Sequence, residues 1–343
     1  MQYWLLPAVG AMHLRLVLLA WLITARGQEQ AKYDRLKSIE AEIKANGFAP
    51  LKNIASINER DGDGLTPLMI AAAAGQMDMV KSFLVAGARA DLVNAKGDTP
   101  CMLAIQNGHY HTSVQLLRAP STDLFQRNHL GANVLHQAVG AGLAVIAQEI
   151  MHSDFERRIN PDTNDVVNAE SRDGVLLVNT RLSGPSNLSG LMMAAQNGGT
   201  EVVRVLLQHK ADVNAQTTSG ETALMYASMM GNADIVALLL EQEDIRTDLA
   251  THDKSFTAIM MAASRGHLAV VEHLVAHALD KKQYHILDAQ DIAGQTALDH
   301  ASDAHEQQVI DRLVVAGISL GFAGPPNVSA DVLRQREENL RKR

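Results

Sequence analysis

The chain has 343 residues, of which 47% are hydrophobic and only 4% aromatic, and its formal net charge is -8. The apolar fraction is ordinary for a chain that buries a core, which excludes general disorder. The acidic balance argues against a nucleic-acid partner, because that surface needs clustered lysine and arginine to displace counterions. The single cysteine, Cys101, excludes an internal disulfide framework and a zinc site made of cysteine clusters.

Residues 1–27 have the three-part pattern of a secretory signal peptide. A basic residue precedes the apolar run 16–25, and a run of about ten residues is too short to span a bilayer. Small residues at Ala25 and Gly27 predict cleavage before Gln28. We expect an exported protein, periplasmic or secreted, with no stable membrane insertion after cleavage. An uncleaved N-terminal anchor and a eukaryotic secretory lumen are the alternatives.

Residues 28–60 predict a helical cap, and residues 319–343 predict a C-terminal tail. The segment from Gln30 to Ala45 has the apolar spacing of an amphipathic helix. The segment from Leu51 to Ile57 fits a second short helix. Glycine and proline in residues 321–326 break the chain before the tail.

A pattern of threonine, paired alanines and glycine recurs along residues 61–318. It is clear in Gly64 to Gly75 and returns 33 residues later in Gly97 to Gly108. Further copies stand at 131–142, 190–198, 220–231, 257–267 and 294–301. Seven copies in phase indicate a repeat architecture.

These residues resemble the ankyrin repeat, in which G-x-T-P-L-H-x-A-A is followed by a Gly-His turn and a second apolar half. That second half is clear in residues 202–215. The resemblance covers about 61–318 and implies an all-α solenoid of helix-turn-helix units, with hairpin fingers between the repeats. Thin layers of alanine, leucine, valine and methionine form such a core, which explains the scarcity of aromatic residues.

The residue types of the repeat have physical reasons. A threonine before proline, as in Thr66 and Pro67, caps a helix because its hydroxyl accepts an otherwise unpaired backbone N–H. The turn glycine, as in Gly75, provides the left-handed backbone that ends the helix. Asn133 replaces the threonine in the third repeat, which predicts a weaker cap. His305 replaces the turn glycine in the seventh repeat, which predicts a less ideal turn.

An insertion at 152–187 separates the third and fourth repeats. Its segment 165–170, the turn at Asp173 and Gly174, and the segment 175–178 read as strand, turn and strand. We therefore expect an extended β-hairpin finger. Insertions in a solenoid often lie on its binding face, and a tolerated surface loop is the alternative.

Two histidines raise the question of a metal site. His273 and His277 stand at the spacing with which one helix face binds zinc. Glu272 precedes the first of them, however, which is not the H-E-x-x-H order of metalloproteases. Their segment fits a second repeat helix, so we interpret them as surface histidines. Cys101 takes an interior position of the repeat, which favours inert packing.

His109, His136 and His267 occupy positions where the resembled repeat carries histidine, and we expect these imidazoles to link neighbouring loops. The chain contains no G-x-S-x-G, Walker or G-x-G-x-x-G sequence. We therefore expect no enzyme activity, catalytic residue, metal or cofactor.

In proteins that resemble this one, a partner protein lies in a concave groove lined by finger tips and by the exposed ends of first helices. The positions that carry over are Lys96, Asp98, Gln106, Asn107, Gln196, Asn197, Glu221, Met229, Met230, Phe256, Ser264 and Arg265. Met229, Met230 and Phe256 predict a sticky patch, because they are apolar residues at expected exposed positions of adjacent repeats. The alternative is that these three pack beneath the long finger.

The sequence thus predicts an exported, monomeric, non-catalytic protein-protein interaction module. Two other hypotheses stay open. One is an anchored scaffold that keeps residues 1–27, and the other is an enzyme or metal protein that uses residues 152–187.

Overall fold

In a computed structural model, the described residues are 30–32, 34–38, 41, 55–158, 176–184 and 186–320. The predicted signal peptide, most of the predicted hairpin finger and the tail beyond residue 320 lie outside them. The helices form two compact units, one ending at Asn128 and the other beginning at His129. The described part of the chain holds no helix long and apolar enough to cross a bilayer.

Unit 1 carries the N-terminal helix and two helix pairs. Residues 30–32 and 34–38 are helical, as predicted, and Leu36 is buried. Lys32 Nζ lies 2.7 Å from Asp63 Oδ2 and ties this helix to the first finger. The elements that follow are η1 (Ala55–Asn58), α2 (Pro67–Ala73), α3 (Met77–Val85), α4 (Pro100–Gln106) and α5 (Tyr110–Leu117).

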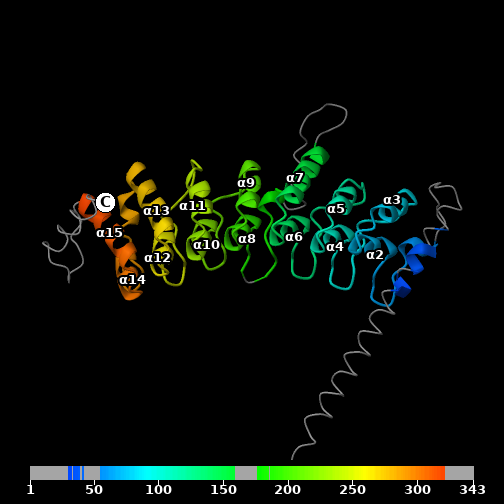
Figure 1. The fold of residues 1–343 in the computed structure, drawn as a ribbon, viewed down its shortest axis with the longest axis horizontal. Coiled ribbons are helices and arrows are strands. Elements are labelled where there is room, and N and C mark those ends of the chain that lie inside the picture. Colours follow the sequence, from blue (N-terminus) through cyan, green and yellow to red (C-terminus); the bar gives the residue numbers. More distant parts are fainter. Residues whose placement is uncertain are drawn as a thin grey trace, which may run out of the picture. The chain divides into compact units, whose positions relative to one another are not determined.

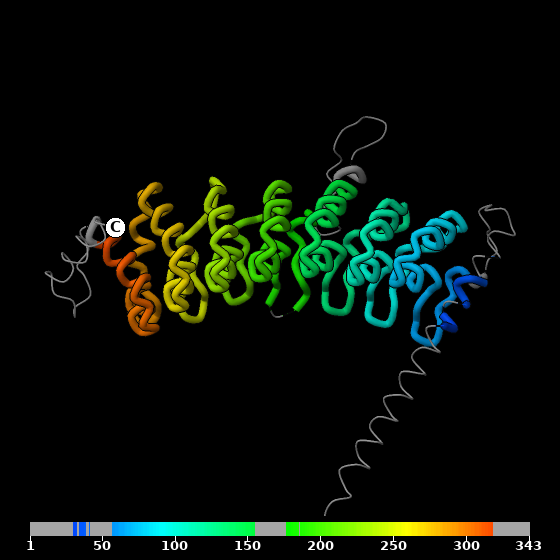
Figure 2. Tube along the Cα trace, viewed as in Figure 1, coloured from blue at the N-terminus to red at the C-terminus, as the bar shows by residue number. Residues whose placement is uncertain are grey.

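Unit 2 repeats the same helix pair. Its first helices are α6 (Val134–Gly140), α8 (Gly190–Asn197), α10 (Ala223–Met230), α12 (Ala258–Ala263) and α14 (Ala297–Asp303). Its second helices are α7 (Ala144–Arg158), α9 (Thr200–Gln208), α11 (Ala233–Leu240), α13 (Leu268–Asp280) and α15 (Gln307–Leu320), and two short helices are η2 (Leu177–Asn179) and η3 (Tyr284–Ile286). Within the unit, α8, α10 and α12 form one layer and α9, α11 and α13 form another (Figure 1). The fingers leave the first-helix layer on the side away from the second helices, as the tube of Figure 2 shows.

Small side chains line the contacts between first helices. Ala71 and Ala72 in α2, and Ala262 and Ala263 in α12, are all 0% exposed. Helix axes approach most closely where the side chains between them are small. The second helices bury larger branched residues, such as the fully buried Leu206 of α9. Stacked layers of this kind need few aromatic residues.

The third-repeat cap is better than its sequence predicted. Asn133 Oδ1 accepts the His136 backbone N–H at 3.1 Å and lies 2.6 Å from His136 Nδ1. Asn133 Nδ2 also donates to Thr180 Oγ1 at 2.9 Å. The expectation of a weak cap is wrong, because asparagine caps a helix at least as well as threonine. His136 Nδ1 takes part in this cap at the start of its own helix. Its expected link to a neighbouring loop stays a prediction.

The turn residues share one backbone conformation. Gly75 and Gly231 have φ angles of 67° and 75°, the left-handed values that glycine adopts without strain. His305 follows the same path with φ 61°. The seventh turn therefore keeps its shape, and the missing glycine results in backbone strain.

The described end of the insertion is helical. Leu177 and Val178, which the sequence placed in a strand, belong to η2, and both are buried. The two isolated β-bridges in the described residues join Arg181 with Ser189 and Ala250 with Thr257. Burial decided this outcome, because η2 contacts α7 and buries both side chains. The rest of the predicted hairpin stays a prediction.

Candidate partner-binding surface

In four of the five first helices of unit 2, one residue in the middle of the helix is less buried than its neighbours. Gln137, Met193, Tyr226 and Met261 are half-buried, whereas most residues around them in α6, α8, α10 and α12 are buried. Each lies five positions before the turn residue of its repeat. These helices pack against one another in chain order, so the four side chains form a row. We call this row, with the two residues before each turn, the first-helix face.

The predicted site residues of unit 1 divide into two groups. Lys96, Gln106 and Asn107 are exposed, as expected for finger and helix-end positions. Asp98 is only 4% exposed. Its Oδ1 accepts hydrogen bonds from Asn128 Nδ2 at 2.8 Å and from Gln106 Nε2 at 3.3 Å. The predicted exposure of Asp98 is therefore wrong, because its buried carboxylate links its own finger to the next one through the hydrogen bond with Asn128.

The helix-end residues of unit 2 lie where the sequence placed them. Gln196, Met229 and Ser264 are half-buried, and Asn197, Met230 and Arg265 are exposed. The side chain of Met230 keeps 47% exposure, so it is an apolar side chain in water.

A carbonyl at the end of α10 joins the fifth and sixth repeats. The Met229 carbonyl oxygen lies 3.2 Å from His267 Nε2 and accepts a hydrogen bond from Arg265 Nη1 at 3.3 Å. His109 Nε2 contacts the Ala73 carbonyl in the same way in unit 1, at 3.0 Å. The predicted linking role of these two turn histidines is therefore confirmed. The link also holds the Arg265 guanidinium beside α10.

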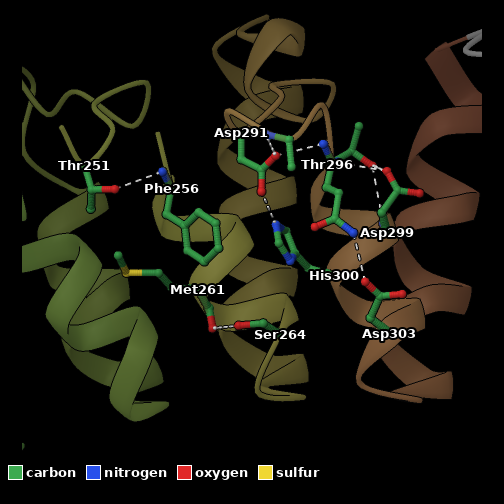
Figure 3. Close-up of polar contacts among 11 residues, drawn as sticks. Thr251, Phe256, Met261, Ser264, Asp291, Thr296, Asp299, His300 and Asp303 are labelled. Carbon is green, nitrogen blue, oxygen red and sulfur yellow. Dashed lines mark hydrogen bonds and ion pairs between the residues drawn. The ribbon is translucent and has the colours of Figure 1, made fainter. Parts of the chain in front are cut away.

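Phe256 lies at the other end of α12. Its half-buried ring meets the His300 imidazole edge-on (Figure 3), with the ring centroids 4.8 Å apart. Lys254 Nζ lies 5.8 Å from the centroid of the Phe256 ring. Phe256 precedes α12 and Arg265 follows it, and a helix of six residues is about 9 Å long. The prediction of one sticky patch with Met229 and Met230 is therefore wrong. The methionines and the phenylalanine belong to opposite ends of the first-helix layer.

Beside Phe256 lies a buried aspartate–histidine contact that the sequence analysis missed. Asp291 Oδ2 lies 3.0 Å from His300 Nε2, and Asp291 Oδ1 accepts the backbone N–H groups of Ala293 and Gln295 at 2.8 and 2.9 Å (Figure 3). Burial raises the pKa of the Asp291 carboxyl, but these N–H donors and His300 outweigh it and hold the pKa below its usual value. The pair stabilises the seventh finger and leaves little of either side chain exposed.

Three hydroxyl groups of the fifth repeat bind one oxygen of the Glu221 carboxylate. Its Oε2 accepts hydrogen bonds from the hydroxyls of Ser219 at 2.8 Å, Thr217 at 2.9 Å and Tyr226 at 3.2 Å. Burial, the Glu221 charge and this hydrogen bond raise the pKa of Tyr226 to about 12. The phenol therefore stays protonated and continues to donate.

The sequence analysis named Glu221 but missed the row of side chains beside it. Counting five residues back from each turn identifies Met193, Tyr226 and Met261, so the signal was present in the repeat register. The Asp291 and His300 pair gave no such signal, because nothing in the spacing of the two residues shows that both become buried.

The structure also places the two histidines and the cysteine for which the sequence raised a metal or thiol role. Among the described residues, no three histidine, cysteine, aspartate or glutamate side chains gather in a group able to hold a metal ion. His273 is exposed, and His277 is half-buried, with a pKa that burial and the nearby Lys281 charge lower. The Cys101 thiol is buried. The placements of His273 and Cys101 agree with their structural interpretation, whereas His277 is less exposed than a surface histidine.

A cavity of about 310 Å³ lies between α7, η2 and α9. Its walls are mostly apolar, with Met151, Leu176 and Val178 beside the polar His209 and Asp154. Burial lowers the pKa of His209, although the nearby Asp154 charge partly opposes this. The cavity involves second helices and not the first-helix face.

Repeated helix pairs joined by fingers define a helical-repeat solenoid protein. The sequence profile for three copies of the ankyrin repeat matches residues 39–126, 68–165 and 171–249, and the single-repeat profile matches residues 255–282. These matches cover more than half of the chain. The chain therefore belongs to the ankyrin-repeat family.

Two curated relatives illustrate the range of the family. The chain is 29% identical over 225 residues to the B-cell lymphoma 3 protein homolog of Mus musculus, a match that covers 64% of this chain and 44% of that protein. It is 26% identical over 223 residues to the Neurogenic locus notch homolog protein 1 of Xenopus laevis, covering 59% and 8% respectively. The chain thus spans less than half the length of either relative.

Two solved structures share the fold. The ankyrin repeat domain of Bcl-3 matches with a TM-score of 0.55 at 24% identity, over 73% of this chain and 99% of that chain. The human ASB11 ankyrin repeat domain matches with a TM-score of 0.55 at 21% identity, over 76% and 100%. Identities this low show a common fold only.

Proposed function

We propose that this protein binds another protein noncovalently, without catalysis, through a concave groove formed by the first-helix face and the adjoining fingers. The exposed Met230 carries the proposal, because a flexible apolar side chain in water beside the half-buried Met193, Tyr226 and Met261 is typical of a binding surface. Solenoids present extended surfaces of this kind, and ankyrin repeats serve as protein-interaction modules.

A photocrosslinking amino acid at position 230 tests this proposal in the native host. We expect a crosslinked partner at this position and none at position 145. Val145 of α7 is the matched control, since it is an apolar residue with 61% exposure on a second helix. Met230→Glu should weaken capture at least about tenfold, because it buries a charge against the partner, whereas Val145→Glu should not. Equal capture through both positions would contradict the assignment.

We further propose that the protein is exported, periplasmic or secreted, as a monomeric array of seven repeats. The support is the composition of residues 1–27, with a basic residue, a short apolar run and small residues before Gln28. N-terminal sequencing of the protein from its host tests the proposal. A start at Gln28 supports export with cleavage, and retention of residues 1–27 would favour the anchored scaffold. Light scattering on the mature chain tests the monomer.

A further inference from the structure

The fifth finger holds the Glu221 carboxylate in place before any ligand arrives. Two backbone contacts close the finger: the Thr217 N–H donates to the Glu221 carbonyl at 2.9 Å, and the Glu221 N–H donates to Thr217 Oγ1 at 3.0 Å. The three hydroxyl donors then fix the carboxylate from one side through Oε2. A group held in this way loses little conformational entropy when it binds a partner.

In the part of the chain that the structure describes, no cation neutralises the charge of Glu221. All three donors are uncharged hydroxyls, and among the described residues Glu221 forms no ion pair, nor does its Oε1 accept a hydrogen bond. Two finger carboxylates differ, because each forms an ion pair with an arginine two positions before it. Asp248 lies 2.8 Å from Arg246 Nη2, and Asp91 lies 2.6 Å from its neighbouring arginine. A half-buried carboxylate with one open oxygen is complementary to a cation.

Apolar side chains continue the same helix face. Tyr226 donates to Glu221 from α10, and Met229 and Met230 follow on the next turn of that helix. A helix of eight residues such as α10 is about 12 Å long. An extended peptide covers about 3.3 Å per residue, so about four residues reach from the carboxylate to the methionines.

We propose that the first-helix face of the fifth repeat binds an extended segment of the partner protein that carries an arginine or lysine on Glu221 and an apolar side chain about four residues away on Met230. This inference rests on the proposed function and names the chemistry of the partner. The cation pairs with the open Oε1, while Oε2 keeps its three hydroxyl donors. The apolar side chain covers the exposed methionine.

Two synthetic peptide pools test the proposal on the full chain. Both pools have a leucine four residues after a fixed position and mixed residues elsewhere; the fixed position is arginine in one pool and glutamate in the other. We expect the chain to retain the arginine pool at least about tenfold better, because a hydrogen bond between charged groups adds this much. Glu221→Gln should remove the preference, since glutamine still accepts the three hydroxyl bonds but has no charge.

Glu241→Gln is the matched control. Glu241 is an exposed glutamate of the same repeat at the end of α11, so the variant makes the same charge change on a second helix. It should keep the full preference for arginine. Thermal unfolding of each variant verifies that both remain folded. Met230→Glu should weaken the retention of the arginine pool.

Three outcomes would overturn the inference. Equal retention of the two pools by the unaltered chain would show that the charge of the peptide plays no part in binding. An unchanged preference for arginine in Glu221→Gln would show that another residue recognises the cation. If neither pool binds while position 230 still crosslinks a partner, the segment chemistry is wrong and the proposed function stands. Failure of both the pools and the crosslink would remove the proposed function itself.

Discussion

The second and fifth repeats carry an acidic residue at the same finger position and use it in opposite ways. Asp98 is buried and bonded to amides, one of which belongs to Asn128 of the next finger. Glu221 is half-buried and bonded only within its own repeat, with one oxygen open. One additional methylene and a different set of neighbours separate a structural carboxylate from a candidate binding one.

This contrast shows that a repeat position does not have one role. The repeat fixes where the backbone lies, and the neighbours thirty residues away decide whether a side chain is enclosed. Asn128 reaches Asp98 from a finger 30 residues further on. Glu221 receives donors from Thr217, Ser219 and Tyr226, all in the same repeat.

Removing each carboxylate is the sharpest test of the contrast. Asp98→Ala should lower the free energy of unfolding by about 1–3 kcal/mol, because it takes an acceptor from the buried Asn128 amide. Glu221→Ala should lower it by less than about 1 kcal/mol, since the exposed Ser219 and the half-buried Tyr226 return to water and the buried Thr217 keeps Ser219 Oγ as a partner. Urea unfolding followed by circular dichroism measures both. Equal losses would mean that the two carboxylates do not differ in role.

The turns offer a second comparison, with smaller effects of opposite sign. Gly231→Ala should destabilise by about 1–2 kcal/mol, because its φ is 75° and a Cβ would lie 2.8 Å from His267 Nδ1. His305→Gly should stabilise by about 0.5–1 kcal/mol, because glycine removes the strain at φ 61°. Thermal unfolding of the two variants is the measurement. A loss of stability in His305→Gly would show that its side chain matters more than its backbone.

Tyr226→Phe sharpens the comparison at Glu221. It removes one of three donors to the carboxylate and keeps the ring. We expect the retention of the arginine pool to fall about threefold, which is roughly half of a typical hydrogen bond contribution. The measurement is the amount of arginine pool that the variant retains relative to the glutamate pool, and the unaltered chain is the control. No change would mean that Ser219 and Thr217 suffice to hold the carboxylate.

A third finger carboxylate, Asp291, should reveal its contribution in how stability depends on pH. Its pKa in the folded protein is lowered, so its contribution to stability is present above its usual pKa of about 4 and is lost as pH falls through the lower folded value. Asp291→Asn should therefore have a flatter dependence of stability on pH below about 4 than the unaltered chain. Unfolding by urea at a series of pH values measures this. Parallel curves would contradict the prediction.

Much of the fold could be predicted because its signals are local. Threonine before the first helix, the paired alanines and the turn glycine lie within one repeat, and the structure confirms them at Thr66, Ala71, Ala72 and Gly75. The failures involve residues from other repeats or from the insertion. Asn133 gains Thr180 as a partner from 47 residues away.

The candidate site was predicted in part for the same reason. Exposure at Met230 follows from its place before the turn, which the repeat register gives. The separation of Phe256 from the methionines does not follow from the repeat register, because it depends on the length of α12 and on His300 of the next repeat.

The amino-acid sequence by itself determined the repeat, its register, its caps and its turns, because these depend on residues within one helix pair and on the period of the apolar positions. Only the tertiary structure decided which polar side chains are enclosed and which face water. Burial depends on stacked neighbours: the next finger contributes Asn128 to the enclosed Asp98, whereas Glu221 receives its three donors from its own repeat.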